Sequence, residues 1–225
     1  MNMEPTSNQT APQTKGRTIP WASFYDTLVG LLSLGQGQAI RQATVELARI
    51  KSGDAVLDVG CGTGDLTLAA KTAAGPGGEA VGTDASAAMI DTARRKAARA
   101  GQDVAFQVDL IENITFPDNR FDVVLCSLMM HHLPDELKRD GLTEIFRVLK
   151  PGGRLLIVDL ESSSSGSIFQ RLSDLMIQLH GGHAAMEDNV KKLTPFVEEA
   201  GLTGVESGKL NRQLSFIKAR KAAGH

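Results

Sequence analysis

Between residues 55 and 160 the hydrophobic pattern switches repeatedly between short apolar runs and the wider spacing of amphipathic helices. The apolar or alternating runs predict strands over 55–59, 79–83, 104–108, 121–128 and 154–158. The helical spacing predicts helices over 65–74, 86–100 and 134–150, with Ser86 as an N-cap and Pro151-Gly152-Gly153 as a stop. Strands and helices that alternate at such short intervals indicate an α/β fold with an open, parallel sheet and right-handed crossovers.

Further patterns flank this alternation. Residues 20–50 predict two short amphipathic helices interrupted at 35–37, and residues 168–179 and 193–200 predict two more. Residues 204–210 and 213–219 read as strands joined by a turn at Asn211-Arg212, close enough to pair as a hairpin. We therefore expect a disordered tail over 1–18 and a single domain over 19–225, with a helical cap at 19–50 and a lid at about 162–190.

Composition narrows the class of protein. The 225 residues are 42% hydrophobic and 22% charged, which is ordinary for a globular chain long enough to bury one large core. A formal net charge of -2 gives no general attraction for nucleic acid or for an anionic membrane. No stretch resembles a signal peptide or a transmembrane helix, and Cys61 and Cys126 lack metal-ligand spacing. We expect a cytoplasmic protein with reduced thiols, no metal site and no stable membrane insertion.

A glycine-rich loop follows the first predicted strand, in the sequence LDVGCGTGD (57–65). Gly60, Gly62 and Gly64 would let a ligand approach the backbone closely. Asp65 stands where the dinucleotide fingerprint requires Gly or Ala, and a carboxylate at a helix N-terminus repels a pyrophosphate. The Lys-Ser/Thr pair of a nucleoside triphosphate loop is also missing, so the pattern favours a ligand without phosphate.

Polar residues end three further predicted strands. Asp84, Asp109 and Ser127 each follow a strand, and the carboxyl ends of parallel strands form the edge at which ligands bind. Asp84, roughly 20 residues beyond the glycine loop, is placed to accept hydrogen bonds from both hydroxyls of a ribose. Asp58 and Asp65 could hold an ammonium group. A ligand with an amino-acid end and a ribose therefore suits the predicted site better than a dinucleotide.

Four segments of the chain resemble the class I S-adenosylmethionine-dependent methyltransferases, and within them the subgroup that methylates small molecules. The segments are VLDVGCGTGDLT (56–67), VGTDAS (81–86), FDVVLCSLMMHHLPD (121–135) and EIFRVLKPGGRLLIVD (144–159). The resemblance implies a Rossmann-like, seven-stranded, mostly parallel sheet with a C-terminal antiparallel hairpin, helices on both faces and a helical lid. It also implies S-adenosyl-L-methionine as the cofactor and S-adenosyl-L-homocysteine as its product.

The resemblance assigns the cofactor-binding residues as well. Those around the methionine part of the cofactor would be Asp58, Gly60, Cys61, Gly62 and Gly64. Around the nucleoside, Asp84 would bind the ribose, Ala85 and Met89 would pack near the adenine, and Asp109 and Leu110 would meet its edge. Cys126 and Ser127 would supply backbone near the sulfonium. Ordinary core packing is the alternative role for Met89 and Leu110.

Methyl transfer from a sulfonium is an in-line displacement, so the protein mainly has to align the acceptor and exclude water. If the acceptor must lose a proton, a general base is needed. His132, just beyond the fourth strand, is the first candidate for a catalytic residue, and bracing of its loop is the alternative role. Substrate or lid contacts are predicted for Trp21, Tyr25, Met129, His131, His180 and His183.

The apolar residues 128–130 and the lid favour a moderately hydrophobic small molecule, methylated at an O, N, S or C atom. The fourth strand ends in SLMM and lacks the Asn/Asp-Pro-Pro-aromatic motif of relatives that methylate nucleobase or glutamine nitrogens. The stretch YDTLVGLLSLG (25–35) resembles quinone-biosynthesis methyltransferases, but the chain diverges from them after the fourth strand.

Two other functions stay open at the level of sequence. An RNA or protein methyltransferase could use a basic surface made of Arg94, Arg95, Lys96, Lys191 and Lys192, although such charge runs are usually solvated helix faces. A non-catalytic protein could retain only the S-adenosylmethionine site. No nucleic-acid partner is expected, and a homodimer is the assembly that the sequence allows.

Overall fold

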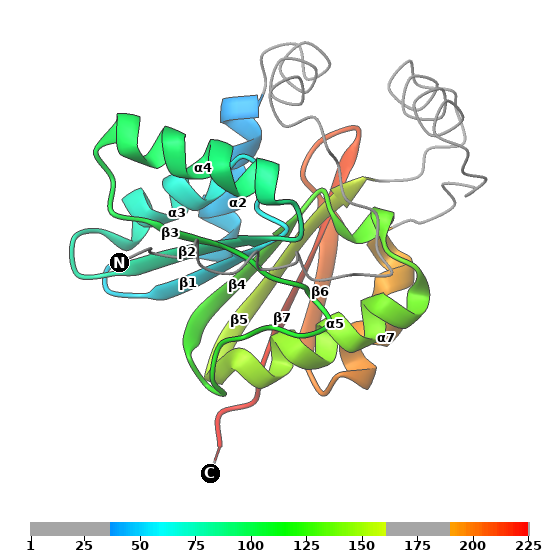
Figure 1. Ribbon diagram of the computed structural model, residues 1–225. Coiled ribbons are helices and arrows are strands. Elements are labelled where there is room, and N and C mark those ends of the chain that lie inside the picture. The colour runs from blue at the N-terminus through cyan, green and yellow to red at the C-terminus, as the bar shows by residue number, and fades with distance from the viewer. Residues whose placement is uncertain (1–36, 161–189, 225) are drawn as a thin grey trace, which may run out of the picture.

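A computed structural model describes residues 37–160 and 190–224 of the chain, apart from the side chain of Lys191. These residues form one seven-stranded sheet with the strand order β3-β2-β1-β4-β5-β7-β6 (Figure 1). The strands are β1 (Ala55–Val59), β2 (Glu79–Asp84), β3 (Ala105–Val108), β4 (Phe121–Ser127), β5 (Leu149–Leu160), β6 (Thr203–Lys209) and β7 (Leu214–Arg220). β7 runs antiparallel to both of its neighbours, and all other pairs are parallel. The predicted mostly parallel sheet with a C-terminal antiparallel hairpin is confirmed.

Helices cover both faces of this sheet. The α-helices are α2 (Gly37–Ala48), α3 (Asp65–Ala74), α4 (Ala87–Ala100), α5 (Asp135–Val148) and α7 (Thr194–Glu199), and the 3-10 turns are η1 (Met130–His132) and η2 (Val190–Leu193). α2, α3 and α4 lie on one face, and α5 and α7 lie on the other (Figure 1). Because β1 and β4 are central, their alternate residues are buried on opposite faces: Leu57 joins the core under α5, and Val56 joins the core under α2 and α3.

The helix boundaries near the glycine loop follow the predicted local signals. α4 begins directly after Ser86, which occupies the N-cap position without a side-chain capping bond. It ends at Gly101, whose left-handed conformation (φ 62°) directs its N–H to the carbonyls of Ala97 and Ala98. These signals are local, which is why the sequence predicts them well.

One predicted boundary is wrong. The helix expected over 134–150 ends at Val148, and β5 begins at Leu149, so Pro151, Gly152 and Gly153 lie inside a strand instead of separating a helix from one. The reason is pairing between distant residues: Leu149 pairs with Phe121 of β4, and the N–H of Arg120 donates to the carbonyl of Val148. The register then shifts between Phe121 and Val123, which accommodates the turn-like residues.

The C-terminal predictions are close to the observed elements. The helix expected over 193–200 is a 3-10 turn followed by the short α7, and the hairpin strands begin and end within about one residue of the expected positions. The tail over 1–18, most of the cap and the lid lie outside the described residues. Among the described residues, no helix is both long and apolar enough to cross a membrane.

Candidate functional site

The glycine loop between β1 and α3 has a backbone that other residues would strain. Gly60, Gly62 and Gly64 have φ angles of 69°, 54° and 85°. A Cβ atom on Gly60 would lie 2.8 Å from Cγ of Met129, and one on Gly64 would lie 2.8 Å from Cβ of Ala93. At Gly62, by contrast, a Cβ would meet no atom within 4 Å. Two glycines therefore permit internal packing, and the third leaves an open approach to the loop backbone.

Asp84 ends β2 and connects that strand to the glycine loop. Its Oδ2 accepts a hydrogen bond from the N–H of Gly62 at 2.9 Å, and its Oδ1 accepts one from the N–H of Ser86 at 2.8 Å. Burial raises the pKa of the Asp84 carboxyl, and the two backbone hydrogen bonds oppose that shift. Each oxygen retains a second lone pair, so the carboxylate can also accept the two hydroxyls of a diol.

Asp58 is a second carboxyl group of this region, and the fold buries it almost completely (1% exposed). Its Oδ2 accepts a hydrogen bond from Oγ1 of Thr67 at 2.7 Å. Its pKa is raised to about 7, mainly by burial and to a smaller extent by the nearby negative charge of Asp84, while the hydrogen bond from Thr67 opposes the shift. Two buried acids held close together favour a positively charged ligand.

Asp65, the other acid proposed for an ammonium, has partners on the protein surface. Its carboxylate lies 2.9 Å from Nζ of Lys96 and 3.8 Å from the guanidinium of Arg41. Of the two acids, Asp58 lies inside the fold and Asp65 lies in a half-exposed ion pair.

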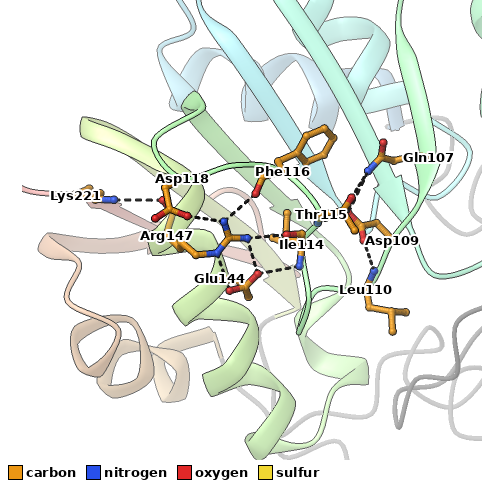
Figure 2. A network of polar contacts seen from close by, with 10 residues as sticks. All are labelled: Gln107, Asp109, Leu110, Ile114, Thr115, Phe116, Asp118, Glu144, Arg147 and Lys221. Atoms are coloured by element: carbon orange, nitrogen blue, oxygen red, sulfur yellow. Dashed lines mark hydrogen bonds and ion pairs between the residues drawn. The ribbon is translucent and has the colours of Figure 1, made fainter.

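Asp109 follows β3 and organises the loop that comes after it (Figure 2). Its Oδ2 accepts hydrogen bonds from the N–H and Oγ1 of Thr115, both at 3.0 Å, and its Oδ1 accepts one from the N–H of Leu110 at 3.1 Å. Nε2 of Gln107 also donates to Oδ2, at 3.2 Å. Leu110 is half-buried on this loop. The sequence predicts Asp109 as a ligand contact. It does not predict the hydrogen bonds by which Asp109 and Thr115 hold the loop, because these join residues six positions apart in an irregular segment.

The remaining predicted cofactor residues are either buried or half-buried. Met89 is 3% exposed on α4, and Ala85 is half-buried before that helix. Cys126 is fully buried in the sheet core, and burial raises the pKa of its thiol, so it contributes packing and backbone instead of a reactive sulfur. Burial raises the pKa of the Cys61 thiol as well.

Two histidines follow β4 in the η1 turn, and they differ in their surroundings. Nδ1 of His131 lies 2.5 Å from Oδ1 of Asp159, and the backbone N–H of His131 donates to Oδ2 of the same carboxylate at 3.1 Å. The side chains of His131 and Asp159 are 11% and 3% exposed. His132 is exposed, and its ring lies against that of His131, with the centroids 3.9 Å apart.

The contact with Asp159 fixes the orientation of the His131 ring, as a general base requires. Because a carboxylate only accepts, the Nδ1–H of His131 donates to Asp159 and leaves Nε2 as the acceptor of the neutral ring. The sequence favoured His132, and it gave Asp159 no role. The available signal was that Asp159 comes at the end of a strand adjacent to β4, as Asp84 does beside β1.

Of the other residues predicted for the substrate or the lid, the structure describes Met129 only. Met129 packs between Gly60 of the glycine loop and the hydrophobic core under α5. Trp21, Tyr25, His180 and His183 lie outside the described residues. Within 37–160 and 190–224, no group of three or more potential metal ligands occurs.

Comparison with known proteins defines the class. Residues 56–153 match the family model described as a methyltransferase domain. The fold resembles a SAM dependent methyltransferase from Aquifex aeolicus (TM-score 0.66, 21% identity, 80% of this chain and 88% of that one). It also resembles phosphoethanolamine N-methyltransferase 2 of Haemonchus contortus (TM-score 0.68, 17% identity, 91% and 60%). The chain therefore has the Rossmann-like class I methyltransferase fold, and the predicted resemblance is confirmed.

Two curated relatives carry names that state a particular methylation reaction. The chain is 37% identical over 146 residues to the ubiquinone/menaquinone biosynthesis C-methyltransferase UbiE of Pseudomonas paraeruginosa, covering 64% of this chain and 56% of that protein. It is 36% identical over 152 residues to the demethylmenaquinone methyltransferase of Symbiobacterium thermophilum, covering 67% and 59%. The matches span less than two thirds of the length of these relatives.

Proposed function

We propose that the protein transfers the methyl group of S-adenosylmethionine to a small aromatic acceptor of the quinol type. The observation that carries this proposal is the meeting of Asp58, Asp84 and the Gly60–Gly64 loop at one edge of the sheet. One curated relative is named for C-methylation in ubiquinone/menaquinone biosynthesis and the other as a demethylmenaquinone methyltransferase, which supports the choice of acceptor.

The chemistry of the donor set fits this cofactor. S-adenosylmethionine carries positive charge at its sulfur and ammonium, and the buried acids Asp58 and Asp84 favour a cation. Its ribose presents two vicinal hydroxyls, which match the free lone pairs of Asp84. The open side of Gly62 leaves room for close approach, and the loop held by Asp109 offers backbone groups for a flat base.

The cofactor supplies a methyl group bonded to a good leaving group, so the chain's own residues have to orient the acceptor and manage its proton. We assign the proton to His131. Nε2 of the neutral ring accepts the hydroxyl proton of a quinol, which raises the electron density of the ring carbon that bonds to the methyl group. Asp159 stabilises the resulting imidazolium and holds its orientation. The bound cofactor would supply the methyl group and leave as a neutral thioether. The methylated ring carbon would then give up its hydrogen as a proton to solvent, which restores aromaticity, and the proton held by His131 would return to the ring oxygen.

The proposed RNA or protein methyltransferase has less support. The guanidinium of Arg94 donates to the carbonyl of Phe106, and Lys96 pairs with Asp65. Arg95 donates to Oγ1 of Thr92. These three basic side chains are engaged within the fold, which weakens the case for a dedicated contact surface.

Methyl transfer from radiolabelled S-adenosylmethionine to a panel of hydroquinones, phenols, amines and thiols tests the proposal. We expect incorporation into hydroquinones.

Asp84→Ala should weaken cofactor binding about tenfold or more in calorimetry, because ribose hydroxyls lose a buried acceptor. Asp91→Ala, on the exposed side of α4, is the matched control and should leave affinity unchanged.

Unchanged affinity in Asp84→Ala would contradict the assignment of the site. Firm cofactor binding without transfer to any acceptor would instead favour the non-catalytic alternative.

A further inference from the structure

A pocket lies on the sheet away from the glycine loop. It is open to solvent, has a cavity volume of about 40 Å³, and is formed by the end of α2 and by strands β5, β7 and β6. Val123 of β4 lines it, and Val123 pairs with Val56 near the start of β1, whereas the glycine loop follows the end of that strand. The pocket is therefore separate from the site around Asp84.

Positive charge is concentrated around this pocket. Its lining contains Arg49, Arg154, Lys218 and Arg220, and Glu206 is its acidic residue. Lys218 pairs with Glu206 at 2.8 Å, and Arg154 pairs with Asp54, which flanks the pocket. The hydrogen bond from Lys218 lowers the pKa of Glu206 most, and the charges of Arg49 and Arg220 lower it further, which indicates that both face this region.

Three features of the pocket are unfavourable for the protein alone. Arg154 and Arg220 stand directly opposite each other on the antiparallel strands β5 and β7, where like charges repel. Nε of Arg154 is buried and has no hydrogen-bond partner among the described residues. Arg49 directly follows α2 and has a left-handed φ of 51°, at a position where glycine or asparagine is usual.

A bound oxyanion would offset the first two of these features and give Arg49 a partner. We propose that the pocket binds a phosphate group, either of a soluble phosphate monoester or of a lipid headgroup. Guanidinium groups match phosphate geometry with two parallel N–H···O bonds, and Arg49, Arg154 and Arg220 approach the pocket from a helix end and two strands. The apolar part of the lining, such as Leu47 and Leu156, would contact the carbon skeleton of the ester.

Titration of the full chain with inorganic phosphate at constant ionic strength, followed by calorimetry and phosphorus NMR, tests the proposal. We expect saturable binding that Arg220→Gln and Arg49→Gly each weaken at least tenfold. Arg49→Gly is informative because glycine relieves the left-handed backbone, so its melting temperature without phosphate should equal or exceed that of the wild type. Arg95→Gln on α4 removes the same charge elsewhere and should bind phosphate as the wild type does.

Absence of saturable binding, or equal binding by all three variants, would overturn the proposal. The source of the phosphate group is then identified with two probes, glycerol 3-phosphate and phosphatidylglycerol vesicles, with phosphatidylcholine vesicles as the reference. Binding to anionic vesicles that is lost in Arg49→Gly and Arg220→Gln but kept in Arg95→Gln assigns the pocket to a lipid headgroup. Binding of glycerol 3-phosphate alone, with the same dependence on the variants, assigns it to a soluble ester.

Discussion

At the scale of single residues, the buried carboxyl group of Asp58 lowers the stability of the folded protein at neutral and alkaline pH. Its folded-state pKa is about 7, well above its ordinary value of 3.8, because burial penalises the charged form. The folded state therefore holds a proton that the unfolded chain has already lost between these pH values. By linkage, the free energy of unfolding falls as pH rises from about 4 to about 7.

Replacement of Asp58 by Asn should reverse this effect. The amide oxygen can keep the hydrogen bond from Thr67 without a buried charge, so the free energy of unfolding at pH 8 should increase by on the order of 2–4 kcal/mol. The gain should shrink as pH is lowered toward 4, and affinity for S-adenosylmethionine at pH 8 should fall. Urea denaturation and calorimetry measure the two quantities. Asp65→Asn, which removes a half-exposed acid, should give no such gain.

The pair formed by His131 and Asp159 makes a different prediction. Asp159→Asn should lower kcat by about 10²–10⁴, because the imidazole of His131 loses the carboxylate that orients it. The KM for the cofactor should change by less than about twofold, since neither residue is proposed to bind it. His132→Asn is the matched control and should retain most activity. A loss in His132→Asn as large as that in Asp159→Asn would restore the hypothesis made from the sequence.

The two histidines also mark the limit of sequence analysis at this scale. The position of Asp84 could be predicted because an acid that ends a parallel strand beside a glycine loop lies at the carboxyl edge of the sheet whatever the details of packing. Which of two adjacent histidines meets a carboxylate depends on the η1 turn and on the alignment of β5 with β4. Both are set by contacts between distant residues, so the sequence could not distinguish His131 from His132.

At the scale of elements, α5 holds the loop between β3 and β4 in place (Figure 2). Arg147 donates to the carbonyls of Ile114 and Phe116 at 2.6 and 2.8 Å, and Glu144 accepts the N–H of Ile114 at 3.0 Å. Asp109 closes the other part of the same loop through Thr115. The loop proposed to meet the adenine is thus fixed from two elements.

Removal of the Arg147 guanidinium should therefore loosen this loop. Arg147→Met leaves two carbonyls without their donor, and we expect a loss of about 1–3 kcal/mol in stability, with faster hydrogen exchange at Ile114 and Thr115. Exchange mass spectrometry on the folded protein measures the second effect. Arg139→Met on the same helix removes an exposed pair with Glu199, so it should leave exchange in the loop unchanged. Unchanged protection of Ile114 in Arg147→Met would contradict the role of α5.

Element boundaries follow the same division between local and distant causes. The start of α3 at Asp65 and the end of α4 at Gly101 agree with prediction because local residues determine them. The start of β5 at Leu149 does not, because pairing with Phe121 decides it.

At the scale of the whole molecule, the sheet separates two groups of charge. The acids Asp58 and Asp84 lie at the carboxyl ends of β1 and β2, and the cationic pocket lies toward the amino ends of β4 and β5. The sequence could predict the first group from motif order and strand direction. It could not predict the second, because Arg49, Arg154 and Arg220 are distant in sequence and only the antiparallel β7 brings Arg220 beside Arg154.

This separation predicts that the two sites act independently. Coupling between distant sites requires an element with two arrangements that both ligands bias, whereas the central strand β1 is buried at every residue and paired on both sides. The dissociation constant of S-adenosylmethionine should therefore change by less than about twofold in saturating phosphate at constant ionic strength. Arg49→Gly should keep wild-type cofactor affinity, and Asp84→Ala should keep wild-type phosphate affinity, both measured by calorimetry. A change of more than about fivefold in either cross-experiment would show that the sheet transmits binding from one end to the other, because that factor corresponds to about 1 kcal/mol of coupling.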